Sequence, residues 1–536
     1  MHRQIPIVGG FYRDPNLHWS RQDCLNWIPV RAERAGGLTE WQLRDAPGLR
    51  PAVQVKQGPG GIRGARNVEG KLFVVVGNTL YQITNAGVAV ARGTIPGVGR
   101  VSMAHNAKGL GNELLIVNGS AGYVYDTQTQ KLAKVTDTGY PGATVVDFVD
   151  QYLAQVEPQG RYWFHSDLAD AHNYNTLDRY QAEGDPDRIV SLLVSHREVL
   201  VFGAQSIEPY VNTGGATGTF ERASNTVIEC GCAARFTPRR LDNSAFWLDD
   251  QRLVRRLDGY TPVILSTEAI AAAFRECTQA EVSQAYAFTW EDAGHKVYYI
   301  TVPGRFTFGY DAKTGEWHRR ASFGLPHWAV SDVVFWNGRW YACDSRFPRL
   351  YELDPDYKLD GTDPLVRERT AGVLWAEQND LTLDEVELLF NTGGRSTIPE
   401  EASARPLSLT SPPYPTAIVE STAVSAELLD MTLRRVRFDA EPPPELLQVS
   451  ASLQGLTLRY PLAYADAPVE AVAVEPSLVG ITLRAPRVYA SAPTEHLAVT
   501  PSLQAITHRA ARLDASAGTE AVALTPSLIG VSLYVP

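Results

Sequence analysis

Four glycines surround an arginine and a histidine between Gly97 and Gly111, in the stretch GVGRVSMAHNAKGLG. A loop of this composition can wrap a phosphate, because glycines let backbone amides approach the anion closely. The spacing does not fit that chemistry, since the stretch lacks the lysine of a phosphate loop and the third glycine of a dinucleotide-binding turn. We therefore interpret it as a connecting loop in which Arg100 and His105 perform no chemistry.

Backbone shape explains these glycines instead. We expect Gly97 and Gly99 to adopt positive φ and Met103 to pack inward. The earlier stretch GPGGIRG, from Gly58 to Gly64, is interpreted as a flexible lead-in to the first strand that follows it.

Two turns approach known motifs without matching their spacing. In DAKTGEW, Asp311 and Gly315 lie four residues apart, whereas the hairpin box of sialidases places Asp and Gly two apart. We predict a tight β-turn with Trp317 packed behind it. In DPDYKLDGTD, residues 354–363, Gly361 is the eighth residue, whereas a calcium loop of the EF-hand type needs glycine at the sixth. A solvated turn is expected there.

Metal ligands and catalytic groups are scattered along the chain. Cys230 and Cys232 are the nearest pair among five cysteines, no second pair stands at matched spacing, and we expect reduced, partly buried thiols. No HExxH pattern and no G-x-S-x-G turn is present. The dispersed histidines are His105, His165, His172, His196, His295, His318 and His327. The sequence therefore predicts no enzyme, cofactor or metal site and assigns no catalytic or binding residue.

The composition is that of a folded, acidic protein. With 44% hydrophobic residues and a net charge of −11, the chain lacks the clustered cations of a protein that binds nucleic acid by neutralising phosphates. Its 536 residues exceed the size of a single hydrophobic core, so two or more domains are expected. No apolar run reaches the roughly 18 residues of a membrane span. The apolar segment in the start MHRQIPIVGGFYRDP is too short for a signal peptide. We therefore expect a soluble protein that is made in the cytoplasm and does not insert stably into a membrane.

A pattern of two strands joined by a Gly, Asn or Asp turn recurs from about residue 70 to 355. The units begin at residues 71, 112, 151, 197, 243, 294 and 337. A spacing of about 40 to 50 residues is typical of β-propeller blades. We predict an all-β fold with a propeller of about six or seven blades, each unit forming the inner hairpin of a four-stranded blade.

The widest gap between units contains STEAIAAAFRECTQAEVSQAY. Ile270 and Phe274 are spaced i, i+4, and Thr278 and Glu281 form a capping-box pattern. Two short helices are predicted there, between the fifth and sixth units.

A different repeat follows the Pro- and Ser-rich stretch STIPEEASARPLSLTSPPYPT near residue 400. One phrase recurs every 25 residues, starting at Ser452, Ser477, Ser502 and Ser527, after a weaker copy at 428–433. Glutamates at positions 420, 445, 470, 495 and 520 keep the same register. We predict a pair of strands per repeat, separated by a Pro-Ser turn. The repeats must stack or pack on something else, because two strands cannot bury an apolar face alone.

The chain is thus expected to have four parts. They are an N-terminal segment at 1–60, the β-propeller at 61–365, a connecting β segment at 366–400 and a C-terminal array of 25-residue β repeats at 401–536.

Several segments resemble, in order and spacing, the packaged-DNA stabilisation proteins of short-tailed bacteriophages, which form the tail hub or nozzle. GVGRVSMAHNAKG is similar to a Gly-x-Gly-Arg-Val-Ser-Met-Ala-His run of that family. CLNWIPV at 24, APGLRP at 46 and GGIRGARNVEGKLFVVVGNTLY at 60 agree in order, and the most specific segment is WFHSDLADAHNYNTLDRYQAEGDPDRIVSLLVSHREVLVFGAQSIEPYVNTG at 163. The resemblance covers about residues 5–395, and the 25-residue array departs from it.

The resemblance implies a structural protein of the virion tail, assembled in the host cytoplasm as a hexameric ring below the portal and its head-to-tail adaptor ring. Residues 1–60 would contact that adaptor. The ring would retain packaged DNA, form the ejection channel without sequence-specific binding, meet a tail needle or plug, and carry tailspikes or fibres. An acidic chain suits a ring that must later release DNA.

Two other classes of function stay open on the residues. A propeller-based receptor-binding or glycan-binding tail protein would stack aromatic side chains on sugars, with Trp317, Trp336 and Trp340 as candidates, although such residues also typically fill the core between blades. A glycan hydrolase would need clustered carboxylates, which only a structure reveals.

Overall fold

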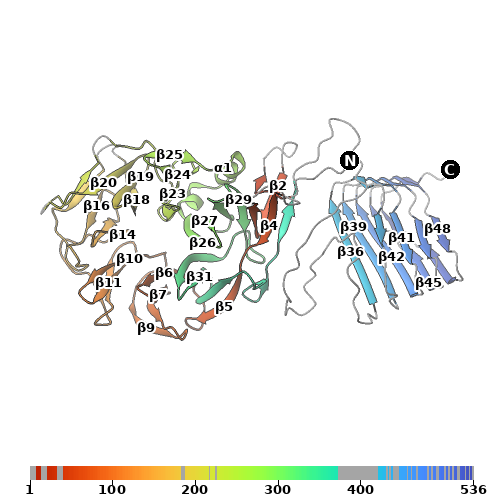
Figure 1. The fold of residues 1–536 in the computed structure, drawn as a ribbon, viewed down its shortest axis with the longest axis horizontal. Helices are drawn as coiled ribbons and strands as arrows, with labels where there is room; N and C mark the ends of the chain where they lie inside the picture. Colours follow the sequence, from red (N-terminus) through yellow and green to blue (C-terminus); the bar gives the residue numbers. More distant parts are fainter. Residues whose placement is uncertain are drawn as a thin grey trace. The chain divides into compact units, whose positions relative to one another are not determined.

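The computed structural model describes residues 8–13, 21–32, 40–182, 187–215, 218–223 and 226–371, together with the backbone of the strands between residues 421 and 533 (Figure 1). It divides into two compact units, Met1–Val373 and Leu374–Pro536. Strands dominate both units, so the predicted all-β fold is confirmed. Within the described residues, no helix has the length and apolar character needed to cross a bilayer.

Four-stranded sheets arranged around an axis form a β-propeller in the first unit (Figure 1). Six blades consist of strands that follow one another in the chain, and a seventh combines three such strands with one from the N-terminal segment. The first strand of each blade contacts the first strand of the next, and β30 contacts β6, which closes the circle. The prediction of about six or seven blades is confirmed.

The strands of the first four blades are β6 (Ile62–Val68), β7 (Lys71–Val76), β8 (Thr79–Ile83) and β9 (Ala89–Thr94); β10 (Ser102–Lys108), β11 (Gly111–Val117), β12 (Gly122–Asp126) and β13 (Lys131–Lys134); β14 (Val145–Val149), β15 (Tyr152–Val156), β16 (Tyr162–His165) and β17 (Arg179–Gln181); and β18 (Ile189–Ser195), β19 (Glu198–Gly203), β20 (Ile207–Asn212) and β21 (Phe220–Arg222). Those of the last three are β22 (Arg239–Leu241), β23 (Ser244–Leu248), β24 (Val254–Asp258) and β25 (Thr261–Ile264); β26 (Tyr286–Asp292), β27 (His295–Val302), β28 (Phe306–Asp311) and β29 (Trp317–Arg320); and β30 (Val330–Trp336), β31 (Arg339–Asp344), β32 (Arg349–Asp354) and β5 (Gly48–Gln54).

Each repeated unit of the sequence forms the second and third strands of a blade, so its interpretation as the inner hairpin is wrong. The innermost strand precedes the unit and carries more polar residues, as in Ala65-Arg66-Asn67 of β6, which hides its strand pattern. A two-residue turn joins the first two strands of every blade. These inner turns are 69–70, 109–110, 150–151, 196–197, 242–243, 293–294 and 337–338. In all but 109–110 both residues have positive φ, as type I′ hairpins require.

The core is a set of apolar layers, one between each pair of neighbouring blades. In β7, Leu72, Val74 and Val76 pack toward the seventh blade. Phe73 and Val75 pack toward the second blade. A strand buried on both faces explains why these units read as nearly continuous apolar runs.

The N-terminal segment completes two blades from the outside. In the seventh blade, β5 pairs antiparallel with β32 from Gly48 opposite Asp354 to Gln54 opposite Arg349. β2 (Arg21–Leu25) extends the sixth blade beside β29 and also pairs with β1 (Tyr12–Arg13) and β35 (Glu368–Thr370). The remaining short strands are the hairpin of β3 (Trp27–Arg31) and β4 (Trp41–Asp45), and β33 (Leu359–Asp360) with β34 (Asp363–Pro364). Residues 1–60, which the sequence set apart from the propeller, thus supply its closing strand.

Two helices lie between β25 and β26, as predicted. They are α1 (Glu268–Arg275) and α2 (Gln279–Ser283). Ile270 and Phe274 are fully buried in the layer between the fifth and sixth blades. The capping box is present, because the Glu281 amide donates to Thr278 Oγ1 and the Thr278 amide donates to Glu281 Oε2.

In the second unit, strands of successive repeats pair in parallel, each residue with the residue 25 positions later, as Ser421 with Leu446 and Leu446 with Ala471. One sheet contains β36 (Ser421–Leu429), β39 (Leu446–Gln454), β42 (Val469–Val479), β45 (Thr494–Val499), β49 (Thr519–Leu524), β46 (Ser502–Gln504) and β50 (Ser527–Ile529). Another contains β37 (Thr432–Leu433), β40 (Thr457–Arg459), β43 (Thr482–Arg484), β47 (Thr507–Arg509) and β51 (Ser532–Leu533). The last contains β38 (Val436–Phe438), β41 (Pro461–Ala465), β44 (Arg487–Ala490) and β48 (Arg512–Ala515).

Of the two expected alternatives, the repeats stack, in the arrangement of a parallel β-solenoid. Two details of the prediction are wrong. A repeat contains three strands, such as β42, β43 and β44, and not a pair. β42 also runs through Pro476 and Ser477, where a turn was expected, because its pairing with β39 continues across both residues. The predicted boundary near residue 400 lies outside the described residues.

Candidate functional site

The glycine-rich loop before β10 wraps a cation. Arg63 in β6 is only 6% exposed and extends its guanidinium group into this loop. Its Nε donates to the Gly99 carbonyl at 2.6 Å, and its Nη1 donates to the carbonyls of Gly77 and Ile95 at 2.7 and 3.0 Å. A phosphate loop presents N–H donors to an anion, whereas this loop presents carbonyl acceptors to a side chain of its own chain. The loop is scaffold in this geometry.

The glycines of the loop differ in their roles. Gly97 has φ of +105°, and an added Cβ there would lie 3.1 Å from Arg63 Nη2. The positive φ predicted for Gly99 is wrong, because its φ lies outside the left-handed region that favours glycine. An added Cβ at Gly99 would meet no atom within 4 Å. The single turn at Gly97 already aims the Gly99 carbonyl at Arg63. Met103 is buried between the first two blades, as predicted.

The interpretation of Gly58 to Gly64 as a flexible lead-in is also wrong. An added Cβ at Gly61 would overlap the backbone of Ser345, and one at Gly64 would lie 2.7 Å from Val101 Cγ2. Gly64 belongs to β6 itself, beside a register shift in its pairing with β7. These glycines permit close backbone packing of the first blade against its neighbours.

Arg100 and His105 make contacts within the propeller. Arg100 Nη1 donates to the Ser331 carbonyl at 2.7 Å, and its guanidinium lies 4.3 Å from the centre of the Tyr286 ring. His105 Nδ1 accepts from Arg66 Nε at 3.4 Å. Burial lowers the pKa of His105, which keeps its imidazole neutral at neutral pH. Both residues thereby link different blades.

The turn at Asp311 is tight, as predicted, but its backbone hydrogen bond joins residues four apart, so it is an α-turn and not the β-turn that was expected. The Gly315 amide donates to the Asp311 carbonyl at 2.8 Å, and the Asp311 carboxylate accepts from the Lys313 amide at 3.0 Å. Trp317 is 2% exposed and donates through Nε1 to the Leu265 carbonyl at 2.9 Å. The His295 Nδ1 lies 2.6 Å from Asp311 Oδ2. The Asp311 carboxylate is thus engaged by hydrogen bonds that stabilise the turn.

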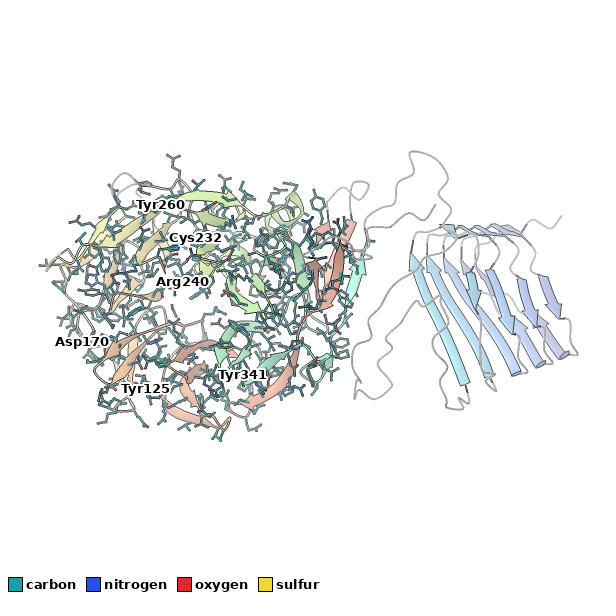
Figure 2. All side chains as sticks on the ribbon, viewed as in Figure 1. Tyr125, Asp170, Cys232, Arg240, Tyr260 and Tyr341 are labelled. Carbon is teal, nitrogen blue, oxygen red and sulfur yellow. The ribbon has the colours of Figure 1, made fainter. Side chains whose placement is uncertain are left out.

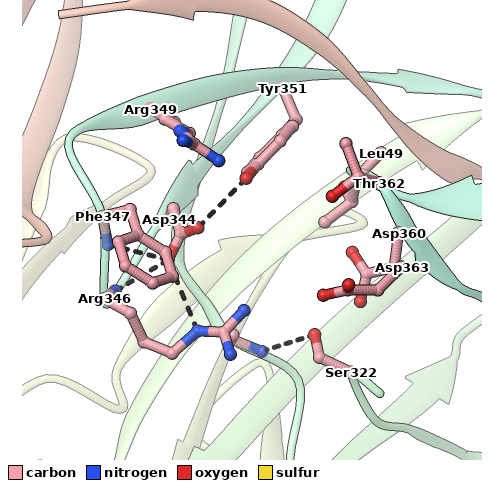
Figure 3. Close-up of a pocket in the computed structure, with 11 residues that line it drawn as sticks. Leu49, Ser322, Asp344, Arg346, Phe347, Arg349, Tyr351, Asp360, Thr362 and Asp363 are labelled. Carbon is pink, nitrogen blue, oxygen red and sulfur yellow. Dashed lines mark hydrogen bonds and ion pairs between the residues drawn. The ribbon is translucent and has the colours of Figure 1, made fainter.

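The acidic run 354–363 lies beside a cavity of about 40 Å³ at the edge of the seventh blade (Figure 3). The cavity is lined by Leu49, Ser322, Ala329, Asp344, Arg346, Phe347, Arg349, Tyr351, Asp360, Thr362 and Asp363. A space of this size holds a few water molecules, whereas sites for small molecules span about 300 to 1,000 Å³.

The expectation of a solvated turn at this run is wrong for two of its carboxylates. Asp360 is 9% exposed, and Asp354 forms an ion pair with Arg50 at 2.6 Å. The docking of β5 against this turn covers it, so these acidic residues hold the N-terminal segment in place.

Among the described residues, one group has donors close enough to hold a metal ion, namely Cys230, Asp249 and Asp250. Its oxygens are already hydrogen-bonded within the chain. Asp249 accepts from the Leu253 amide at 2.7 Å and pairs with Arg255, and Asp250 accepts from the Gly231 amide at 2.8 Å. Burial raises the pKa of the Cys230 thiol to about 12, which disfavours the thiolate that binds metals. All five cysteines are free and buried.

The tryptophans offered for sugar stacking lie in or against the layers between blades. Trp336 is buried and donates through Nε1 to the Gly70 carbonyl at 2.8 Å. Trp340 packs against the layer between the sixth and seventh blades and donates to the Glu291 carbonyl at 2.6 Å. Trp317 and Trp336 are thus closed to a glycan, and Trp340 is half-buried with its indole nitrogen bound to the backbone.

Sequence reasoning missed the residues that hold the blades together through charge. Arg63 was hidden inside GPGGIRG, and the ion pair of Arg240 with Asp147, at 3.5 Å, joins the fifth blade to the third. The adjacent Arg239-Arg240 in a strand-like segment was the available signal, because successive strand residues point to opposite faces and two consecutive cations leave neither face apolar.

Known proteins resemble this chain in sequence over the propeller. The model of a family described as Bacteriophage P22 Gp10, beta-propeller, matches residues 3–358. The tail hub protein gp10 of Salmonella phage P22 is 23% identical over 354 residues, which are 61% of this chain and 69% of that protein.

Solved structures are similar at a lower level. The extracellular domain of a one-component system from B. thetaiotaomicron aligns with a TM-score of 0.41 and 7% identity over 57% of this chain, which spans 40% of that chain. Virginiamycin B lyase from Staphylococcus aureus aligns with a TM-score of 0.41 and 9% identity over 57% of this chain and 98% of its own.

The family match spans well over half of the sequence and includes every blade of the propeller. The chain therefore belongs to the Bacteriophage P22 Gp10 β-propeller family and is a structural protein of a phage tail, as its resemblance to the tail hub proteins predicted.

Proposed function

We propose that this protein is the hub of a short phage tail. Six copies form a ring below the portal and its adaptor, retain the packaged DNA, and later serve as its ejection channel. A needle or plug closes the far end, and tailspikes or fibres attach around the side. The observation that carries the proposal is the family match over residues 3–358 together with the relative that is named a tail hub protein.

The charge of the chain supports this role. A channel that retains DNA and then releases it must not bind phosphates along its length, and a net charge of −11 disfavours such binding. Assembly in the host cytoplasm and a place in the virion tail follow from the same proposal.

Polar contacts between the inner turns of neighbouring blades support the role of a tail part that bears mechanical force. Arg197 pairs with Asp150 at 2.9 Å, His196 Nε2 lies 2.9 Å from Asn243 Oδ1, and Lys296 pairs with Asp242 at 2.6 Å. These contacts join the turns of the third, fourth and fifth blades in sequence and link the fifth turn to the start of β27 in the sixth blade. Because these contacts are exposed, each contributes at most about 1 kcal/mol, and together they align neighbouring blades.

Exposed leucines support contacts between copies. Leu168 and Leu177, in the connection between β16 and β17, are 61% and 75% exposed. Contiguous exposed apolar residues mark interaction sites, and we propose that these two leucines belong to such a patch. Replacing both with Asp should reduce the fraction of rings seen by analytical ultracentrifugation, while the melting temperature of the single copy stays unchanged.

Cryo-electron microscopy of virions tests the proposal. We expect six copies around the tail axis beneath the portal adaptor, and particles made without this protein should lose their DNA. Density for the protein only at fibre tips would overturn the hub and favour a receptor-binding protein.

A further inference from the structure

Charged side chains gather around the axis of the propeller. Arg66 lies in β6, Asp147 in β14, Arg240 in β22 and Asp332 in β30, so four blades contribute one charged residue each from an innermost strand. Figure 2 places Arg240 near the middle of the circle of blades.

One ion pair shows that two of these side chains meet across the axis. Arg240 Nη2 lies 3.5 Å from Asp147 Oδ1, although their strands belong to the fifth and third blades. Asp147 Oδ2 accepts from the Val194 amide of the fourth blade at 2.9 Å. Contacts that span three consecutive blades require the side chain to reach inward from the innermost strands.

Further cations lie close to this pair. Arg239 in β22 and Arg100 in the loop before β10 influence each other electrostatically, and Asp147 and Asp332 act on both Arg66 and Arg239. Partial burial lowers the pKa of Arg66 and Arg239. We call this group the axial cluster. It consists of Arg66, Arg100, Arg239, Arg240, Asp147 and Asp332.

The axial cluster has more cations than anions. Four arginines and two aspartates give 4 − 2 = +2, whereas the whole chain carries −11. His105, beside Arg66, adds no charge because burial lowers its pKa. Arg100 Nε is buried and has no hydrogen-bond partner among the described residues. The cluster therefore combines an excess of cations with an unused donor on Arg100, while Arg240 is half-exposed and accessible to a ligand from water.

We propose that the axial cluster binds a divalent oxyanion of the phosphate class. Guanidinium groups offer paired N–H donors that match the oxygens of phosphate, and two negative charges neutralise the excess of two. The ligand is a single small group, either a free ion or a phosphate monoester. A DNA duplex is excluded as the ligand, because its charges extend along a line and need rows of cations.

Isothermal titration of the full-length protein with sodium phosphate, against sodium chloride of equal ionic strength, tests the proposal. We expect saturable heat for phosphate alone. Arg240→Gln should weaken the affinity at least tenfold, while Arg339→Gln, which removes the same charge from an exposed ion pair with Glu352, should leave it unchanged. Glucose 6-phosphate as a second probe distinguishes a monoester from the free ion, and binding of either supports the site.

A second variant keeps the test independent of folding defects. Asp332→Asn removes a negative charge from the cluster but keeps the oxygen that accepts from the Val333 amide at 3.0 Å. Its phosphate affinity should rise several-fold. Equal heats for phosphate and chloride, equal affinities of the Arg240→Gln and Arg339→Gln proteins, or an unchanged or reduced affinity of Asp332→Asn would overturn the proposal.

Discussion

At the scale of single residues, the loop around Arg63 predicts that substitutions of Gly97 and Gly99 differ in their effect on stability. Gly97→Ala should destabilise the propeller by about 1 to 3 kcal/mol, because alanine is strained at positive φ. Gly99→Ala should change the free energy of unfolding by less than about 0.5 kcal/mol, since an added Cβ meets open space. Urea denaturation of the two variants measures the difference, and equal effects would contradict the assigned roles.

His318 should make stability depend on pH. Burial lowers its pKa to about 3, whereas an unfolded imidazole titrates near about 6.5. Between these values the unfolded state binds a proton that the native state does not, so stability decreases as the pH falls below about 6.5, by about 1.4 kcal/mol per pH unit. His318→Gln should remove this part of the slope. Urea midpoints measured from pH 7.5 to 5.5 for both proteins check the prediction, which fails if the two curves are parallel.

Residue roles could be predicted from the sequence only where local chemistry decides them. The absence of a phosphate-loop lysine was sufficient to reject phosphate binding at Gly97. The sequence could not reveal that Arg63 fills the loop, because the carbonyls of Gly77, Ile95 and Gly99 converge on it only after the first blade has folded.

At the scale of elements, closure by β5 makes one N-terminal leucine essential. Leu49 in β5 is 4% exposed in the layer between the sixth and seventh blades. Leu49→Ala should cost about 2 to 5 kcal/mol through the cavity that it leaves. Leu110→Ala is the matched control, because Leu110 is 97% exposed and should matter by less than about 0.5 kcal/mol. Thermal unfolding of both variants provides the measurement, and a mild effect at Leu49 would mean that β5 is not needed for closure.

Elements were predictable where the strand pattern was strong. The second and third strands of each blade stood out because they are buried on both faces, and the capping box of Thr278 identified α2. The innermost strands were missed because the axis favours polar residues such as Arg66 and Asp147. The pairing of β5 with β32 joins residues about 300 apart in the chain, and no local pattern encodes such a contact.

At the scale of the whole molecule, the 25-residue register of the second unit permits a deletion test. Removing residues 471–495 leaves residue i paired with i + 25 throughout, so the shortened array should keep a cooperative unfolding transition of reduced amplitude. Removing residues 471–494 shifts one strand by a single position and turns its side chains to the opposite face, which should abolish the transition. Circular dichroism melts of the two deletions make the comparison, and equal behaviour would contradict the in-register stacking.

The antiparallel pairing of β5 with β32 also decides how the propeller responds to mechanical tension. The chain enters β5 at Gly48 and leaves β32 at Asp354, and these residues lie opposite each other. A force that pulls the preceding and following segments apart therefore opens this ladder one pair at a time, as in unzipping, whereas a shearing load would strain all pairs at once. The remaining resistance comes from β33 against β5 and β35 against β2. Under tension transmitted through the N-terminal segment, the short strands β33 and β35, which follow the seventh blade, are thus the first to resist separation.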